Sequence, residues 1–359
     1  MRRIGRLFGI ALIALLVTGM TGWSILAIYY SDLPGESLRG VLASIFGVGT
    51  AGAFLVVPNR RRTLVGFLVV FVLLVGWWLS IAPRNDRDWQ PEVAVLPSAV
   101  IAGDRVTLRN IRDFDYRTET DFTPRYYDRT FDLQQLDSVD LIAVYWAGDA
   151  IAHIMVSFGF AGQDFVAFSI ETRKERAEGY SAIKGFFKQY ELVYVVGDER
   201  DLIGARTTYR HPREDVYLYR TRLPPERARS LFLGYLRRIN QLTREPEFYN
   251  TLTTNCATNV VRHVQLAGGR ARYNWKILLS GYAPEYAYEL GSLDTSLPFA
   301  ELRRLSHVNA RAQAADKAPD FSRRIREGLP APARPVRTSV RSAATPKRPS
   351  VWRRTGSGG

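Results

Sequence analysis

Cys256 and His153 are the two residues whose side chains point most directly to nucleophilic chemistry in this 359-residue chain. Cys256 is the only cysteine, so it has no partner for a disulfide within the chain. In an exported domain an unpaired thiol is a liability unless it is used. Taken alone, one cysteine in an apolar helix is more often a small core residue. The choice between the two interpretations depends on the position and neighbours of the thiol.

The sequence around Cys256 predicts that this residue begins a helix. It follows Thr254 and Asn255, either of which is suited to be the helix N-cap, and Gly268-Gly269 is placed to end the helix. Unpaired N–H groups and the helix dipole would then surround the sulfur and lower the pKa of the thiol. The same N–H groups could hold a developing oxyanion. A nucleophilic cysteine benefits from both effects.

A cysteine nucleophile also needs a base, and the chain has four histidines. His307 lies at the edge of the C-terminal tail, and His211 lies in a polar loop beside a proline. His263 follows Cys256 by seven residues on the same helix, about 10 Å along the axis, which is too far for a hydrogen bond. His153 remains, on an alternating strand of residues 153–160. A lone strand histidine is more often structural, but the combination favours catalysis, and we expect His153 to face Cys256.

A third polar group is expected to orient the histidine. A turn at residues 162–164 leads into a return strand that carries Ser169 and Glu171. Glu171 is the predicted partner of His153, but the hairpin register is open by about two residues, so Ser169 is an alternative. Arg173 could pair with Glu171 or meet a lipid phosphate, and a structural ion pair is the simpler interpretation. The acidic and basic residues 198–201 are interpreted as a loop with ion pairs.

The remaining pattern predicts a mixed α+β domain between residues 84 and 308. Its expected extended segments are residues 93–96, 104–111, 139–145, 192–196 and 216–220. An amphipathic helix is expected over 224–242, opened by two prolines. No dinucleotide fingerprint, phosphate loop or zinc-ligand spacing is present in the sequence, so no metal or cofactor is expected.

Three apolar stretches precede this domain, at residues 7–29, 40–57 and 64–82. Each is long enough to cross a bilayer as a helix. The first could be a signal peptide, but it is too long for one and no clear cleavage site follows, so we predict an uncleaved anchor. Small residues in the second stretch predict close packing among the three helices rather than a homodimer face.

Positive charges predict the orientation of these spans. Arg2, Arg3 and Arg6 precede the first span, and residues 60–62 between the second and third are all arginine. The positive-inside rule places the N-terminus in the cytoplasm and everything after Pro83 on the opposite side, the periplasm of a bacterial inner membrane.

The net charge of +14 is concentrated at the two ends of the chain. Residues 1–83 carry seven basic and two acidic side chains, and residues 309–359 carry twelve and three, which leaves residues 84–308 nearly neutral. A basic face for nucleic acid is therefore not supported. The proline-, arginine- and serine-rich residues 309–359 are predicted to be a disordered tail.

Histidine on a strand, followed much later by Asn-Cys opening a helix, resembles the circularly permuted papain-like order of the lecithin retinol acyltransferase group. Residues from about 89 to 269 more closely resemble the Lnb N-terminal periplasmic domain family. The matching segments are 110–116 (NIRDFDY), 152–160 (AHIMVSFGF), 169–173 (SIETR), 198–201 (DERD) and 254–256 (TNC). The resemblance implies a papain-like fold in which an antiparallel sheet packs on helices.

The resemblance also implies a function. It points to a thiol acyltransferase whose partners are a membrane lipid and a bacterial lipoprotein, with Cys256 as nucleophile and His153 as base. Asn255, Arg173 and Ser169 are the expected substrate contacts. Three spans before the domain, with none evident after it, depart from some relatives and leave the substrate open. A cysteine hydrolase acting on peptides or cell-wall amides is the first alternative. A non-enzymatic envelope protein with a buried cysteine is the second.

Overall fold

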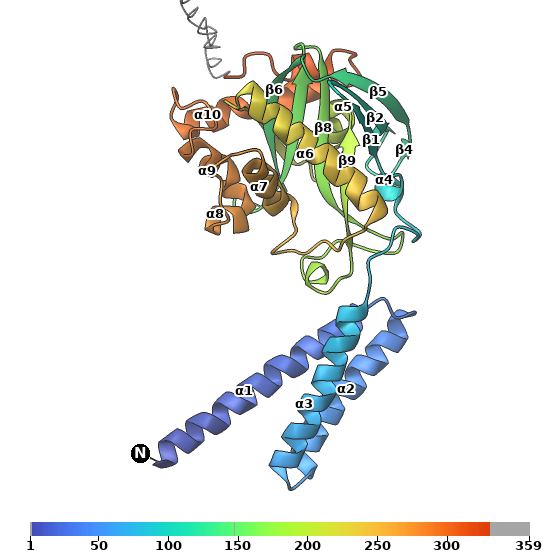
Figure 1. Cartoon of the computed structure of the whole chain (residues 1–359), viewed down its shortest axis with the longest axis vertical. Coiled ribbons are helices and arrows are strands. Elements are labelled where there is room, and N and C mark those ends of the chain that lie inside the picture. The colour runs from blue at the N-terminus through green and yellow to red at the C-terminus, as the bar shows by residue number, and fades with distance from the viewer. Residues whose placement is uncertain (1, 147, 331–359) are drawn as a thin grey trace, which may run out of the picture.

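The computed structural model describes residues 2–146 and 148–330 and consists of a helical stalk below an α+β domain (Figure 1). The stalk contains α1 (Arg2–Tyr29), α2 (Glu36–Val56) and α3 (Arg60–Ser80). All three are long and apolar enough to cross a membrane, and few of their residues are buried within the protein. The three apolar helices predicted from the sequence are confirmed.

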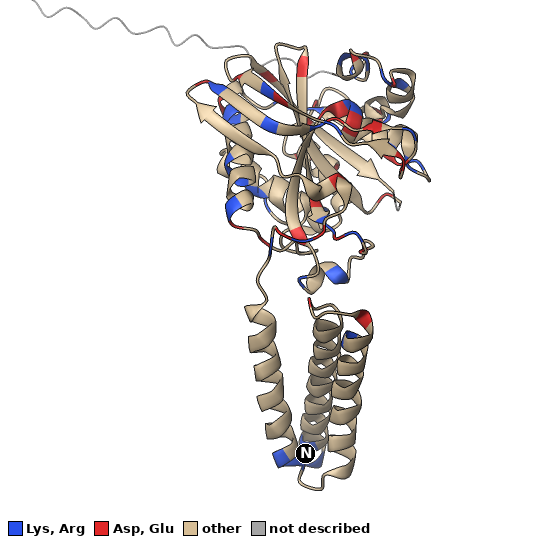
Figure 2. Cartoon of the chain, turned by 90° about the vertical axis from the view of Figure 1, so that its right-hand side faces the viewer, with Lys and Arg blue, Asp and Glu red and all other residues tan. Residues whose placement is uncertain are grey.

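Charge is distributed unequally along the stalk. Arg60, Arg61 and Arg62 begin α3 at the end far from the domain, where α1 also begins, and the turn that contains Asp32 lies at the domain end (Figure 2). This is the arrangement that the positive-inside rule would give for an exported domain. The cytoplasmic position of the N-terminus stays a prediction.

The domain is built on one eight-stranded sheet in which β1, β2, β9, β8, β7, β6 and β10 lie side by side and β5 also pairs with β2. Neighbours are antiparallel except for β2 and β9. Their bounds are β1 Ser98–Ala102, β2 Arg105–Arg112, β5 Tyr126–Asp132, β6 Leu136–Tyr145, β7 Ala152–Phe160, β8 Asp164–Arg173, β9 Glu191–Gly197 and β10 Asp215–Arg220. A second, two-stranded sheet pairs β3 (Asp115–Tyr116) with β4 (Phe122–Thr123).

Alternation along the strands produces a core on each face of the sheet. Ile154 and Phe158 of β7 pack on the face covered by α6 (Pro225–Arg244) and α7 (Cys256–Leu266). Met155 packs on the other face, under α5 (Glu199–Gly204), α11 (Asn309–Ala314) and α12 (Phe321–Arg324). The other helical segments are α4 (Pro91–Ala94), η1 (Lys184–Phe186), η2 (Ala205–Tyr209), α8 (Trp275–Leu278), η3 (Ser280–Tyr282), α9 (Ala283–Glu289) and α10 (Phe299–Ser306).

Two local predictions were wrong. Residues 93–96 do not form an extended segment throughout, because Pro91 opens the short helix α4 that includes Val93. Residues 198–201 are not a loop, because the Asp198 side chain accepts a hydrogen bond from the Arg200 N–H and caps α5. The sequence interpretation also missed the strands β1 and β5.

The folded domain extends beyond the predicted boundary at residue 308. Phe321 and Ile325 are buried against the sheet. Arg326 forms buried ion pairs with Asp140 and Glu199. The prediction of a disordered tail from residue 309 is therefore wrong for residues 309–330, and its remainder, residues 331–359, lies outside the described residues.

Candidate active site

The site lies where two neighbouring strands of the sheet separate. The pairing of β7 with β8 ends at Met155 and Ser169, whereas β7 stays paired with β6 as far as Ala152. β8 likewise stays paired with β9 as far as Arg173. Helix α7 contacts both separated strands. The N-terminus of a helix is thereby brought to the separated ends of β7 and β8, which carry His153 and Glu171.

Asn255 fixes the start of this helix. Its Oδ1 accepts a hydrogen bond from the Thr258 N–H at 2.9 Å, and the Thr258 Oγ1 accepts one from the Asn255 N–H at 2.9 Å. This reciprocal capping confirms the predicted helix start. The Asn255 Nδ2 donates to the Thr251 carbonyl at 2.7 Å, so this side chain is engaged within the protein and not free for the expected substrate contact. The first two N–H groups of α7, those of Cys256 and Ala257, have no intrahelical acceptor.

The structure places Cys256 and His153 close enough for each to shift the pKa of the other. Burial raises the pKa of the Cys256 thiol, but the charge and hydrogen bond of His153 and the backbone N–H of Ile154 lower it further, so the net shift is downward. Burial lowers the pKa of His153, but the charges of Glu171 and Cys256 raise it to about 9. Each of the two groups therefore stabilises the charged form of the other.

Both candidates for the third group contact the same histidine nitrogen. The His153 Nε2 lies 2.6 Å from the Ser169 Oγ and 3.2 Å from the Glu171 Oε1. The Ser169 hydroxyl in turn donates to the Glu171 Oε1 at 2.5 Å. Nδ1 is therefore the nitrogen left for the sulfur. Ser169 acts here as a link between histidine and carboxylate, which differs from the substrate contact expected for it.

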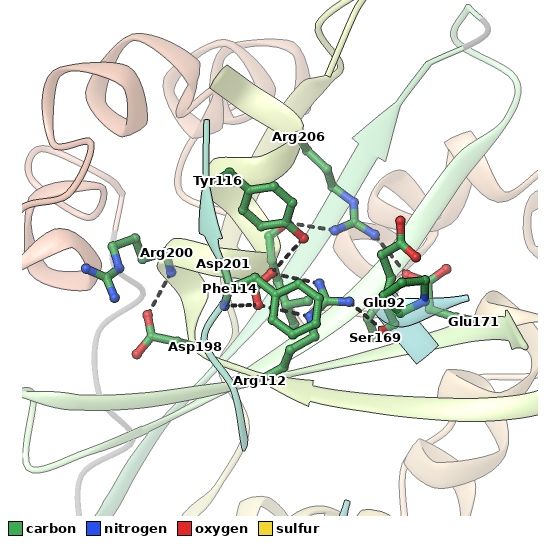
Figure 3. A network of polar contacts seen from close by, with 12 residues as sticks. Glu92, Arg112, Phe114, Tyr116, Ser169, Glu171, Asp198, Arg200, Asp201 and Arg206 are labelled. Carbon is green, nitrogen blue, oxygen red and sulfur yellow. Dashed lines mark hydrogen bonds and ion pairs between the residues drawn. The ribbon is translucent and has the colours of Figure 1, made fainter. Parts of the chain in front are cut away.

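Arg206 is the last residue in this series of hydrogen bonds, and it was not predicted from the sequence. Its Nη2 donates to the Glu171 Oε1 at 2.8 Å, and its side chain is nearly inaccessible (Figure 3). Burial raises the pKa of Glu171, but the charges of His153 and Arg206 bring it well below its usual range. Arg206 lies on η2, a single π-helical turn, a feature common at functional sites. An arginine after the apolar residues 202–205 was the only signal in the sequence.

A second buried ion pair supports the wall beside Arg206. The Asp201 carboxylate accepts two hydrogen bonds from the Arg112 guanidinium, at 2.9 and 2.7 Å, and one from the Phe114 N–H at 2.8 Å (Figure 3). The ion pairs predicted for residues 198–201 are present. Within residues 2–146 and 148–330, no group of three or more His, Cys, Asp and Glu side chains is arranged to hold a metal ion.

Arg173 lies elsewhere than predicted. Its guanidinium donates to the carbonyls of Val93 and Ala94 and to the Asn85 Oδ1, and it stacks over the Trp89 ring. It does not pair with Glu171, and its buried donors are engaged within the protein. Arg173 therefore ties β8 to the segment that leads out of the membrane helices.

The other histidines take no part in the site. His263 stacks on the Tyr235 ring at 4.0 Å, and its Nε2 lies 3.0 Å from the Tyr194 hydroxyl. Burial and nearby arginines lower the pKa of His263 to about 3, so it is neutral. His307 pairs with Asp215 at the surface.

Cys256, His153 and Glu171 open into a cavity of about 380 Å³. Its wall combines charged groups with aromatic rings. The charged groups are Glu92, Arg112, Glu119, Glu171, Lys174, Arg206, Arg210 and Glu214, and the rings include Tyr116, Trp146, Tyr180 and Tyr249. A substrate carbonyl placed at the sulfur could be attacked by the thiolate while the N-terminal N–H groups of α7 face its oxygen.

The fold and the site define a membrane-anchored α+β domain with a buried cysteine beside a half-buried histidine and carboxylate. Residues 122–282 match the Lnb N-terminal periplasmic domain, a stretch that includes both Cys256 and His153. The match supports the family resemblance drawn from the sequence motifs. Curated proteins and solved structures gave no match. Together with the three apolar helices, the family match supports a membrane-associated periplasmic protein. The papain-like arrangement stays a prediction.

Proposed function

We propose that this protein is a membrane-anchored thiol acyltransferase that uses Cys256 as its nucleophile. The observation that carries the proposal is the placement of Cys256 at the capped N-terminus of α7 beside His153, whose Nε2 contacts Ser169 and Glu171, with Arg206 bound to the same carboxylate. A buried thiol whose pKa is lowered by a charged partner is typical of a reactive cysteine and not of a structural one.

The first half of the reaction acylates the cysteine. The Cys256 thiolate attacks the carbonyl carbon of a lipid ester, and the N–H groups of Cys256 and Ala257 hold the oxyanion. The carbon–oxygen ester bond then breaks, and the leaving alkoxide takes the proton of the His153 imidazolium. The products are a thioester on Cys256, a free alcohol and a neutral imidazole.

The second half transfers the acyl group to an amine. A free α-amine attacks the thioester carbonyl, the neutral His153 accepts the amine proton, and the carbon–sulfur bond breaks to restore the thiolate. Once the amide has formed, Cys256 is again a thiolate and His153 again an imidazolium. An α-amine has an ordinary pKa of about 7.7–8.0, so a substantial share is unprotonated near neutral pH. By the family resemblance, the amine belongs to the N-terminus of a bacterial lipoprotein.

Trapping the thioester tests this function. Full-length protein in vesicles with a labelled acyl donor should gain one acyl mass on Cys256 that neutral hydroxylamine removes. Adding a peptide with a free N-terminal amine should discharge the thioester into an amide. A Cys256→Ala variant should gain no mass. Failure to acylate Cys256 with any of a panel of phospholipids and diacylglyceryl peptides would contradict the proposal.

The polar lining of the cavity favours a second candidate, a cysteine hydrolase. Four carboxylates and four basic groups around the site admit water and could bind a polar amide. The acylation step would be the same, with water in place of the amine. Discharge of the acyl-enzyme to free carboxylic acid at the same rate with and without amine would favour the hydrolase.

A further inference from the structure

Residues 180–187, which we name the bridging loop, occupy the membrane-facing end of the domain. The loop contains the short helical turn η1 and lies directly above the ends of the three membrane helices (Figures 1 and 2). It connects β8 with β9, two of the strands at the site. Its contacts reach both the membrane helices and the catalytic cysteine.

One end of the bridging loop is attached to the membrane helices. The Phe187 ring packs against Trp23 and Tyr30 of α1, with ring centroids 6.4 and 5.9 Å away. The next residue, Lys188, donates from its Nζ to the carbonyls of Trp78 and Ile81 at 3.0 and 3.1 Å, at the end of α3. A lysine in this position satisfies carbonyls that the helix end leaves unpaired. These contacts hold the loop at the level where the helices leave the bilayer.

The other end is attached to the site. The Thr251 Oγ1 donates to the Ala182 carbonyl at 2.7 Å, and the Thr251 N–H donates to the Gly185 carbonyl at 3.3 Å. A Cβ on Gly185 would collide with the Thr251 Oγ1, so this close approach needs glycine. Thr251 also accepts the hydrogen bond from Asn255, the residue before the nucleophile. Tyr180 lines the same cavity as Cys256.

Between these two attachments the surface is apolar. Ile183, Phe186 and Leu252 are 52%, 37% and 42% exposed. Lys184 lies among them and adds a positive charge. Adjacent exposed apolar groups with an aromatic ring and a lysine are typical of surfaces that enter the headgroup boundary of a membrane.

We propose that Ile183, Phe186 and Leu252 insert into the bilayer surface beneath the domain and form a lip between the lipid and the cavity at Cys256. The partner is a phospholipid bilayer, because the membrane helices to which the loop is joined fix the bilayer on this side. Delivery of a lipid ester across the lip to Cys256 rests on the proposed function. Contact of the lip with the membrane does not.

Because Cys256 is the only cysteine, replacing it allows one introduced cysteine to be labelled at a chosen position. The membrane contact can then be measured without an assay of enzymatic activity. In the Cys256→Ser background, Ile183→Cys, Phe186→Cys and Leu252→Cys each carry one environment-sensitive fluorophore in full-length protein reconstituted in phosphatidylglycerol–phosphatidylethanolamine vesicles. Nitroxide-labelled lipids should quench all three, and iodide in the water should not. Val100→Cys on β1, where the side chain is 50% exposed, is the matched control and should respond only to iodide. Lip labels that behave like the Val100 label would overturn the proposal.

A second experiment tests delivery. The double variant Ile183→Ser/Phe186→Ser should lower transfer from a vesicle-resident donor at least tenfold while iodoacetamide alkylates Cys256 at the wild-type rate. Val100→Ser should change neither rate. If the double variant transferred the acyl group at the wild-type rate, the lip would have no role in delivery. If the wild-type protein transfers no acyl group, the proposed function fails, and the quenching experiment still decides the membrane contact.

Discussion

At the scale of single residues, the site consists of a thiol and a series of groups that set its charge. His153 lowers the pKa of the Cys256 thiol, and Glu171 in turn stabilises the proton on His153. His153 and, to a smaller extent, Arg206 hold the pKa of Glu171 well below its usual range. Removal of one group should therefore be visible as a pKa shift in the group beside it.

Glu171→Gln tests this dependence. Without the carboxylate charge, the pKa of His153 should fall from about 9 toward its ordinary value. His153 then loses its proton at a lower pH and can no longer protonate the leaving alkoxide above it. The alkaline limit of acyl-enzyme formation should therefore move to lower pH. The pH profile of acyl-enzyme formation measures this shift.

Glu119→Gln is the matched control, because Glu119 lines the same cavity but accepts a hydrogen bond from the His211 N–H instead of His153. Its pH profile should match that of the wild-type protein. Equal profiles for Glu171→Gln and the wild-type protein would mean that the carboxylate does not act on His153.

At the scale of elements, the first turn of α7 and the separation of β7 from β8 position the site. Asn255→Ala removes the cap of α7 and should cost about 1 kcal/mol of stability, because an orphan N–H loses its acceptor. It should also raise the pKa of the thiol, since the start of the helix is no longer held. Chemical denaturation and the pH dependence of alkylation measure the two effects.

Asn274→Ala provides a comparison for the cap. Asn274 caps α8 by accepting from the N–H groups of Lys276 and Ile277. Its loss should cost a similar amount of stability and leave the alkylation profile unchanged. A thiol pKa that moves equally in both variants would show that the cap of α7 has no specific effect on the sulfur.

Local signals were sufficient to predict the elements that carry Cys256 and His153. Alternation placed His153 on a strand, and the Thr-Asn-Cys sequence placed Cys256 at a helix start. The separation of β7 and β8 depends on long-range pairing, and so does the position of Arg206, which comes from 35 residues beyond Glu171. Neither is encoded in a local pattern. Arg173 was misplaced for the same reason, since its partners come from residues 79 or more positions earlier.

At the scale of the whole molecule, the C-terminal segment closes the face of the sheet opposite α7. Composition suggested disorder from residue 309, because prolines among arginine, serine and alanine leave little apolar content. A few spaced apolar residues nevertheless bury against the sheet, and Arg326 neutralises two buried carboxylates. Burial of spaced residues in a polar segment depends on a partner surface that the segment itself does not reveal.

Arg326→Met should destabilise the domain by about 3–5 kcal/mol, because Asp140 and Glu199 would stay buried without their shared partner. Arg324→Met breaks a half-exposed pair with Asp320 and should cost less than about 1 kcal/mol. Thermal or urea unfolding of the two variants measures the difference. Equal losses would mean that Arg326 does not hold the C-terminal segment in place.

The central claim is that Cys256 is a thiolate because His153 is its charged partner. The most direct measurement is the rate of iodoacetamide alkylation of Cys256 as a function of pH in the full-length wild-type protein and in His153→Ala. The wild-type midpoint should lie below the ordinary thiol pKa of about 8.5, and the variant midpoint should lie at or above it, because burial, the largest influence on the sulfur, is then no longer offset by the imidazolium. A wild-type midpoint at 8.5 or higher, or one that His153→Ala leaves in place, would contradict the account.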